Sequence, residues 1–175
     1  GKPLQEVSLI HFVSNEVTNR SIPLEGLTKG TIVSIDEVAI EKLLNGNSDF
    51  IQLGLPLSER QNLKLNLVRH EIFAEDFALY TSSEPGIPFN YTPGVHYKGV
   101  VEGDPSSLVA VSVFNNEVMA LISTGHGNMI LGRIDNDRES RHILYAENDL
   151  DKTSGFECST PDDGFGYTEE DLKPQ

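Results

Sequence analysis

The sequence contains a single cysteine, Cys158, and no tryptophan among its 175 residues. One cysteine excludes an internal disulfide framework and any multi-cysteine zinc site. Aromatic residues make up 7% of the chain, too few to favour a stacking platform for sugars or single-stranded nucleic acid. No apolar run approaches the about 18 residues needed to cross a membrane, and no secretion signal begins at Gly1. We therefore expect no membrane partner, and any secretion signal to be absent from this sequence.

Basic residues are also scarce, since 13 Lys and Arg face 27 Asp and Glu, for a net charge of −14. A nucleic-acid surface needs a surplus of Lys and Arg, so we expect no nucleic-acid partner. Residues 148–175 hold eight acids against two lysines, together with three glycines and two prolines. Such a segment has little apolar surface to offset the entropy cost of ordering it. The composition predicts a folded body at 1–147 and an extended acidic tail at 148–175.

Short apolar and β-branched runs recur through the body. In residues 63–69 Leu alternates with mostly polar residues, which is the period-two pattern of a strand with one buried face. Breaks between later runs are short, and Asn115-Asn116 suits a two-residue hairpin turn. Tight turns between short strands favour antiparallel neighbours. The predicted strands are 7–13, 31–35, 50–55, 63–69, 77–81 (followed by a loop), 97–102, 108–114, 118–123, 129–134 and 142–145.

One helix is predicted at residues 36–44. It places Ala39 above Leu43 at a spacing of four, has acids in its first turn, and is followed by Asn45-Gly46 as a stop signal. The fold class we expect is mainly β: an antiparallel β-sandwich or partial barrel with one short helix and an acidic extended C-terminal tail.

Catalytic motifs are not found in the sequence. It has no His-Glu-x-x-His pattern, no Gly-x-Ser-x-Gly elbow and no feature that pairs two carboxylates across a cleft. A lone histidine usually has a structural or surface role. We therefore expect a non-catalytic chain with no cofactor of its own. Its histidines occur singly, as His11, His70, His96, His126 and His142.

The most specific segment spans residues 96–112 and predicts a strand, a sharp turn and a second strand. Gly99 would thin one face for close packing, while Gly103 and Pro105 would make the corner. Val109 and Val111 would share the buried face. From the residues alone this is a β-hairpin.

The same segment resembles the propeptide domain of secreted reprolysin/adamalysin-type zinc metalloproteases. That family's signature reads His-Tyr-x-Gly-x-Val-x-Gly-x-Pro-x-Ser-x-Val-Ala-x-Ser. The resemblance extends weakly through residues 118–134 and back to 77–80, and the first half of the body agrees only in its general β pattern. The matching positions are His96, Tyr97, Gly99, Val101, Gly103, Pro105, Ser107, Val109, Ala110 and Ser112.

This resemblance implies a function for Cys158. Cys158-x-x-Pro161-Asp162 is similar to the cysteine switch of such propeptides, with Pro161 and Asp162 in the switch loop. The resemblance implies that the Cys158 thiolate binds the catalytic zinc, a metal present only with the catalytic domain. Two positions depart from the pattern. Glu157 stands where a basic residue usually precedes the cysteine, and Ser159 stands where a glycine usually follows it. The alternative is an incidental free thiol in a disordered tail.

The function implied is the N-terminal prodomain of a secreted zinc metalloprotease, acting as intramolecular chaperone and latency inhibitor. Its partner would be its own catalytic domain, which would hold the zinc. A secreted β-sandwich binding module without protease activity is the alternative. A free-standing hydrolase has the least support, because no group of residues suggests a reaction.

Overall fold

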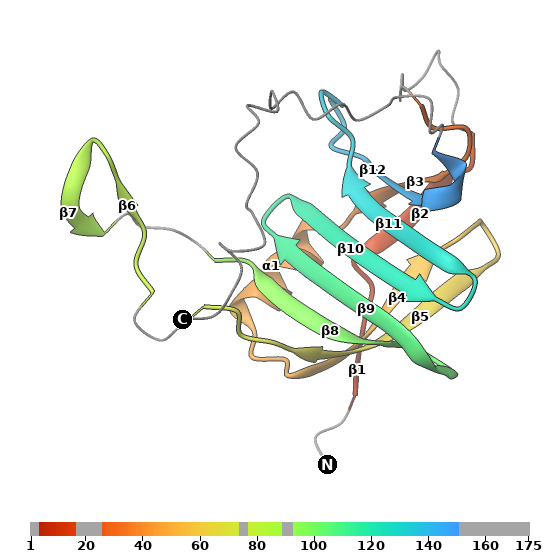
Figure 1. Ribbon diagram of the computed structural model, residues 1–175, viewed down its shortest axis with the longest axis horizontal. Coiled ribbons are helices and arrows are strands. Elements are labelled where there is room, and N and C mark those ends of the chain that lie inside the picture. Colours follow the sequence, from red (N-terminus) through yellow and green to blue (C-terminus); the bar gives the residue numbers. More distant parts are fainter. Residues whose placement is uncertain (1–3, 17–25, 74–76, 89–92, 151–175) are drawn as a thin grey trace, which may run out of the picture.

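The computed structural model describes residues 4–16, 26–73, 77–88 and 93–150. These residues confirm a mainly β fold with one α-helix (Figure 1). A short 3₁₀ turn, Glu147–Asp149, follows the last strand. The elements are β1 Gln5–Val7, β2 Ile10–Ser14, β3 Thr31–Ile35, α1 Glu37–Asn45, β4 Phe50–Pro56, β5 Asn62–Arg69, β6 Tyr80–Thr81, β7 Glu84–Pro88, β8 Val95–Val101, β9 Asp104–Phe114, β10 Glu117–Thr124, β11 Gly127–Arg133 and β12 His142–Ala146.

Ten of the described strands form one curled sheet in the order β1-β4-β5-β8-β9-β10-β11-β12-β3-β2. Strands β8 to β12 are sequential antiparallel neighbours. Phe114 pairs with Glu117, which confirms the two-residue turn predicted at Asn115-Asn116. The sheet departs from the antiparallel prediction at one pair, because β1 runs parallel to β4.

Both edges of the sheet come from one segment near the N-terminus. The sequence predicts a single strand at 7–13, but the chain bends at Ser8 and Leu9. The residues before the bend pair with β4, and those after it pair with β3. Leu9 is fully buried and its carbonyl accepts the Asp36 backbone N–H at 2.8 Å. This bend joins the two edges and makes the sheet a partial barrel.

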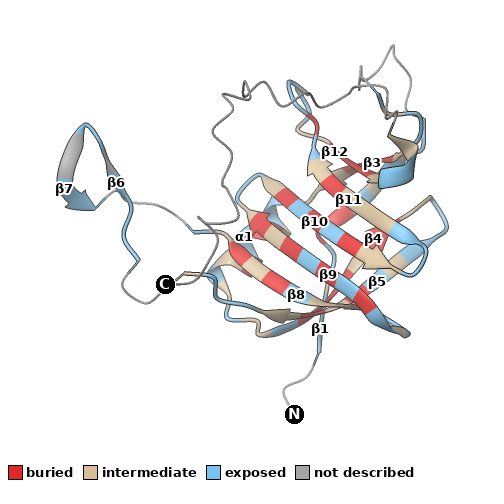
Figure 2. Ribbon diagram, in the orientation of Figure 1, coloured by how far each residue is buried: buried red, intermediate tan, exposed pale blue. Residues whose placement is uncertain are grey.

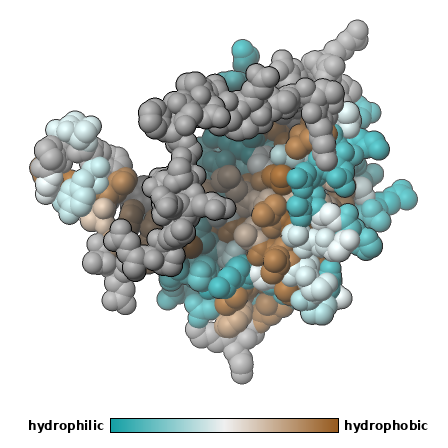
Figure 3. Space-filling view, viewed as in Figure 1, coloured by the Kyte–Doolittle hydropathy of each residue, from teal (hydrophilic) through white to brown (hydrophobic). Residues whose placement is uncertain are grey.

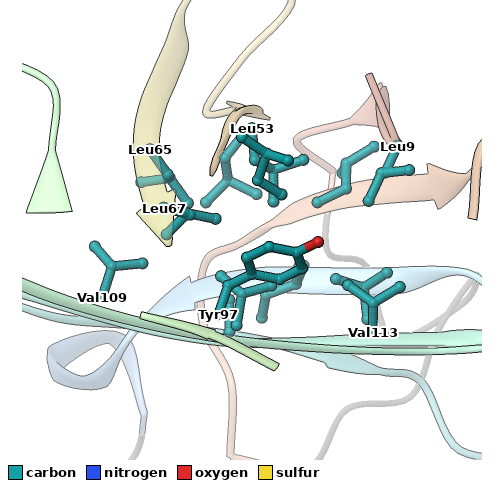
Figure 4. Packing of buried hydrophobic residues seen from close by; sticks show 14 of the residues in the cluster. Leu9, Leu53, Leu65, Leu67, Tyr97, Val109 and Val113 are labelled. Atoms are coloured by element: carbon teal, nitrogen blue, oxygen red, sulfur yellow. The ribbon is translucent and has the colours of Figure 1, made fainter. Parts of the chain in front are cut away.

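The barrel interior is apolar. Along β9 the buried Val109, Val111 and Val113 alternate with more exposed residues, as Figure 2 shows and the period-two pattern predicts. They face Leu65 and Leu67 of β5 across the interior, and the side chains meet in one cluster (Figure 4). This cluster is the main core.

Helix α1 closes one end of the barrel. The Asp36 carboxylate caps it by accepting the Ala39 N–H at 2.9 Å, while Ile40 and Leu43 enter the core and the helix contacts β9. We call the end with α1, where β9 ends, the helix end. We call the opposite end, with the turns at 102–103 and 125–126, the open end.

The strand predicted at 77–81 is mostly wrong. Only Tyr80–Thr81 is a strand, and it pairs with β7 in a small hairpin that stands away from the barrel. The sequence predicts a loop where β7 lies. Phe77, Leu79 and Tyr80 are exposed, so their apolar pattern marks no core strand.

A close approach between β5 and β8 leads to the first prediction. A Cβ at Gly99 would overlap the Asn66 carbonyl oxygen, whereas a Cβ at Gly54 in β4 would meet nothing within 4 Å. Gly99→Ala should therefore lower the free energy of unfolding by about 3 kcal/mol. Gly54→Ala, the matched control, should change it by less than about 1 kcal/mol. Urea denaturation measures both, and equal losses would contradict this account.

Candidate functional site

The ten positions that match the signature lie together in the β8–β9 hairpin. Strand β8 supplies His96, Tyr97 and Gly99, and β9 supplies Pro105 and Ser107. Gly103 lies in the turn between the strands, with a φ of +81° that favours glycine. The hairpin runs from the helix end to the open end of the barrel.

A hydroxyl group holds the turn of this hairpin. The register shifts between Gly99 and Val101, so the ladder alone does not fix the corner. Ser107, which is 1% exposed, accepts the Val101 N–H at 2.8 Å and donates to the Asp104 carbonyl at 2.6 Å. Ser107 therefore fixes both sides of the turn from within.

The first two motif residues anchor the other end of the hairpin. Tyr97 is buried, its hydroxyl donates to the Ser48 carbonyl at 3.0 Å, and burial raises its pKa. His96 Nδ1 hydrogen-bonds Ser112 Oγ at 2.9 Å. Its ring makes edge contacts with Phe73 and Phe114, with centroids 6.1 and 5.9 Å away.

Burial lowers the pKa of His96, so its imidazole is neutral near pH 7. Its Nε2 atom is buried and has no hydrogen-bond partner among the described residues. Neutrality limits the cost of leaving this nitrogen unpaired. His96 and Tyr97 therefore anchor the helix end of the hairpin to the residues around it.

His142 is a second buried histidine. Its Nε2 accepts the Val118 N–H at 3.1 Å, which places the proton on Nδ1, and Nδ1 donates to the Ser140 carbonyl at 3.1 Å. Burial lowers its pKa. In the same loop the Arg141 side chain bonds Asp137 at 2.7 Å and holds the pKa of that carboxyl at about 2. His142 thus has a structural role between β12 and β10.

The remaining histidines lie apart. His11 Nε2 is 3.8 Å from Asp36 Oδ2, His70 follows β5, and His126 lies in the β10–β11 turn. Within the described residues no three His, Cys, Asp or Glu side chains are grouped to hold a metal. No helix there is long and apolar enough to span a membrane.

The hairpin turn forms one wall of a cleft of about 630 Å³ at the open end. The apolar side chains of Leu63, Val101 and Met129 contribute to it from three strands. We call this the open-end cleft. It is lined by Leu63, Val101, Glu102, Gly103, Asp104, Thr124, His126, Gly127, Asn128, Met129, Ala146 and Asn148.

Hydrogen bonds fix the polar rim of the open-end cleft. Asp104 Oδ1 accepts the Ser106 hydroxyl at 2.6 Å and the Ser106 N–H at 3.1 Å, and these bonds lower the pKa of Asp104. Glu102 accepts from Gln52 at 3.0 Å, and Asn128 donates to Glu147 at 2.8 Å. This cleft could not be predicted from the sequence, because its walls come from turns that only the folded barrel brings together.

The chain leaves the described region beside this cleft. Leu150 forms an isolated bridge with Leu27, and the Asp149 carbonyl accepts from the Thr28 N–H at 3.1 Å and the Thr28 hydroxyl at 3.0 Å. Asp149 and Leu150, assigned to the tail from composition, thus pair with residues 27–28. Cys158, Pro161 and Asp162 lie outside the described residues.

An apolar surface covers the outer face of β9 and β10 (Figure 3). Leu108, Met119 and Leu121 are exposed there, and Leu121 pairs with Ala110. These residues occupy the outward positions of the same strands whose inward residues form the core.

The chain was compared with protein-family models and with curated proteins, and neither comparison finds a match.

The Ser107 contacts lead to the second prediction. Ser107→Ala would leave the buried Val101 N–H without its acceptor, so the free energy of unfolding should fall by about 1–3 kcal/mol. The Val101 amide should also exchange its hydrogen faster. Ser106→Ala, the matched control, removes an exposed hydroxyl that donates to Asp104 and should cost under about 0.5 kcal/mol. Unchanged exchange at Val101 would contradict the role of Ser107.

The third prediction concerns pH. The folded pKa of His142 lies below the ordinary 6.5, so the unfolded chain binds its proton first as pH falls, and stability decreases below about pH 6.5. Between pH 7.5 and 5.5 the wild type should lose up to about 1.4 kcal/mol more than His142→Gln, which does not titrate. Denaturation at both pH values measures this difference. Equal losses would show that His142 is not held neutral.

Proposed function

We propose that this chain is the prodomain of a secreted reprolysin-type zinc metalloprotease. It would assist the folding of the catalytic domain and keep that domain inactive, with Cys158 as the zinc ligand. The observation that carries the proposal is the long signature match in residues 96–112. The structure adds that its residues have distinct places in one hairpin: Gly99 at a close approach, Gly103 at the turn and Ser107 beneath it.

The chemistry of inhibition follows from zinc coordination. A catalytic zinc keeps one position for the attacking water. A thiolate is a soft, strong ligand that can take this position, and coordination removes its proton. Tethering raises its local concentration to roughly millimolar, so a modest intrinsic affinity is sufficient. Proteolysis or oxidation of the thiol would reopen the site.

The position of Leu150 sets the reach of the thiol. Leu150 pairs with Leu27 on the body, and Cys158 follows eight residues later. Eight residues span at most about 29 Å when fully extended. The catalytic zinc would therefore have to lie within about that distance of Leu150.

The fourth prediction tests the thiol. Added to an active reprolysin-type catalytic domain, the wild-type chain should inhibit peptide cleavage. The inhibition constant of Cys158→Ala should be at least about tenfold higher, because this variant leaves the fourth zinc position to water. Ser159→Ala, next to the thiol, is the matched control and should inhibit like the wild type. Equal inhibition by all three proteins would remove Cys158 from the mechanism.

A broader test concerns the coding sequence. The proposal requires a catalytic domain with the pattern His-Glu-x-x-His-x-x-Gly-x-x-His encoded downstream of Gln175 in the same reading frame. A stop codon there would overturn it.

The open-end cleft supports a second candidate, a secreted binding module without protease activity. Ligand sites are commonly clefts of about 300–1,000 Å³ with mostly apolar walls, and the mouths of β-barrels are frequent locations. The cleft, at about 630 Å³, meets this description without any catalytic domain.

A further inference from the structure

The open-end cleft combines an apolar floor with an acidic rim. Leu63, Val101 and Met129 face it from three different strands, and Ala146 adds a fourth. All four belong to inward or edge positions of the barrel, where the interior opens to solvent. An apolar group placed here would be removed from water on several sides.

The charged side chains that line this floor are mainly acidic, and His126 is the lining residue that can carry a positive charge. Glu102 and Asp104 line the cleft, whereas none of its lining residues is Lys or Arg. Hydrogen bonds from Ser106 favour the ionised form of Asp104, because they lower its pKa. The net charge of −14 adds to the negative potential of the surface.

We propose that the open-end cleft binds a small organic cation with an apolar body. The body would lie on the floor formed by Leu63, Val101 and Met129, and the cationic head would lie at the rim beside Glu102 and Asp104. This inference goes beyond the proposed prodomain function and does not depend on it.

Charge and solvation explain the selectivity of such a site. The rim carboxylates are not buried, so a cationic head bound there keeps part of its hydration and avoids most of the desolvation cost of a buried ion pair. An anionic head on the same apolar body would meet two like charges. A ligand with a neutral head would be bound by the apolar contact of its body only. The order of affinity should therefore be cation, then neutral alcohol, then anion.

The fifth prediction uses three probes with one chain length: octyltrimethylammonium, octanol and octanoate. Titrated into the full chain in low salt, the cation should bind at least about tenfold more tightly than octanoate. In ¹H–¹⁵N spectra the largest shifts should fall on the amides of Gly103, Gly127 and Asn128. Adding 0.15 M salt should reduce the preference for the cation, since the rim charges are exposed to solvent.

Matched variants locate the site. Glu102→Gln with Asp104→Asn removes both charges but keeps the oxygens that accept from Gln52 and Ser106. It should weaken the cation about three- to tenfold and leave octanol unchanged. Asp135→Asn, at an exposed acid beyond β11 at the helix end, is the control and should behave like the wild type.

Filling the cleft tests the apolar floor. The Ala146→Phe variant, once shown to have an unchanged thermal transition, should bind all three probes more weakly. The proposal is overturned if octanoate binds the wild type as tightly as the cation, or if the folded Ala146→Phe variant binds the cation normally. It is also overturned if the wild-type shifts fall on Leu108 and Leu121 of the outer face. No protease enters these assays, so their outcome is separate from that of the prodomain proposal.

Discussion

The barrel depends on the bend at Ser8 and Leu9. Because the residues before and after it pair with opposite edges of the sheet, these two edges are brought together through a covalent bond rather than by side-chain contacts alone. Leu9 is fully buried at this point, and its carbonyl receives the N–H of Asp36, the residue that caps α1. The same few residues therefore set both the curvature of the sheet and the start of the helix.

Closure of this kind makes the two ends of the barrel unequal. Helix α1 lies between β3 and β4 in sequence, so the end at which β3 finishes is the end it covers. Among the described residues, short turns form the opposite end, and the open-end cleft lies between them. The open-end cleft is thus a consequence of the topology. The topology also explains why residues from β5, β8, β11 and β12 line the same cleft.

Much of the fold could be predicted from the sequence, because its strands have one buried and one exposed face. Alternation in residues 63–69 and the Asn115-Asn116 turn are local signals, and the structure confirms both. The helix follows from the acids at its start, its stop signal at Asn45-Gly46 and its spacing of four, and the structure confirms it at Glu37–Asn45 with Asp36 as the cap. The bend at Leu9 could not be predicted, since residues 7–13 are mostly apolar or β-branched and contain no Gly, Pro, Asn or Asp to mark a turn. What bends them is pairing with strands far away in the sequence.

The candidate site was harder to predict from the sequence for the same reason. Gly99 and Gly103 could be singled out as packing and turn residues, and Ser107 through the resemblance, yet none of these signals showed that their hairpin forms a wall of the open-end cleft. Through this hairpin the two proposals share a physical basis. Ser107 ties Val101, whose side chain lies on the cleft floor, to Asp104, whose carboxylate lies on its rim. A change that loosens the turn would therefore alter the shape of the cleft and the position of the Asp104 carboxylate together.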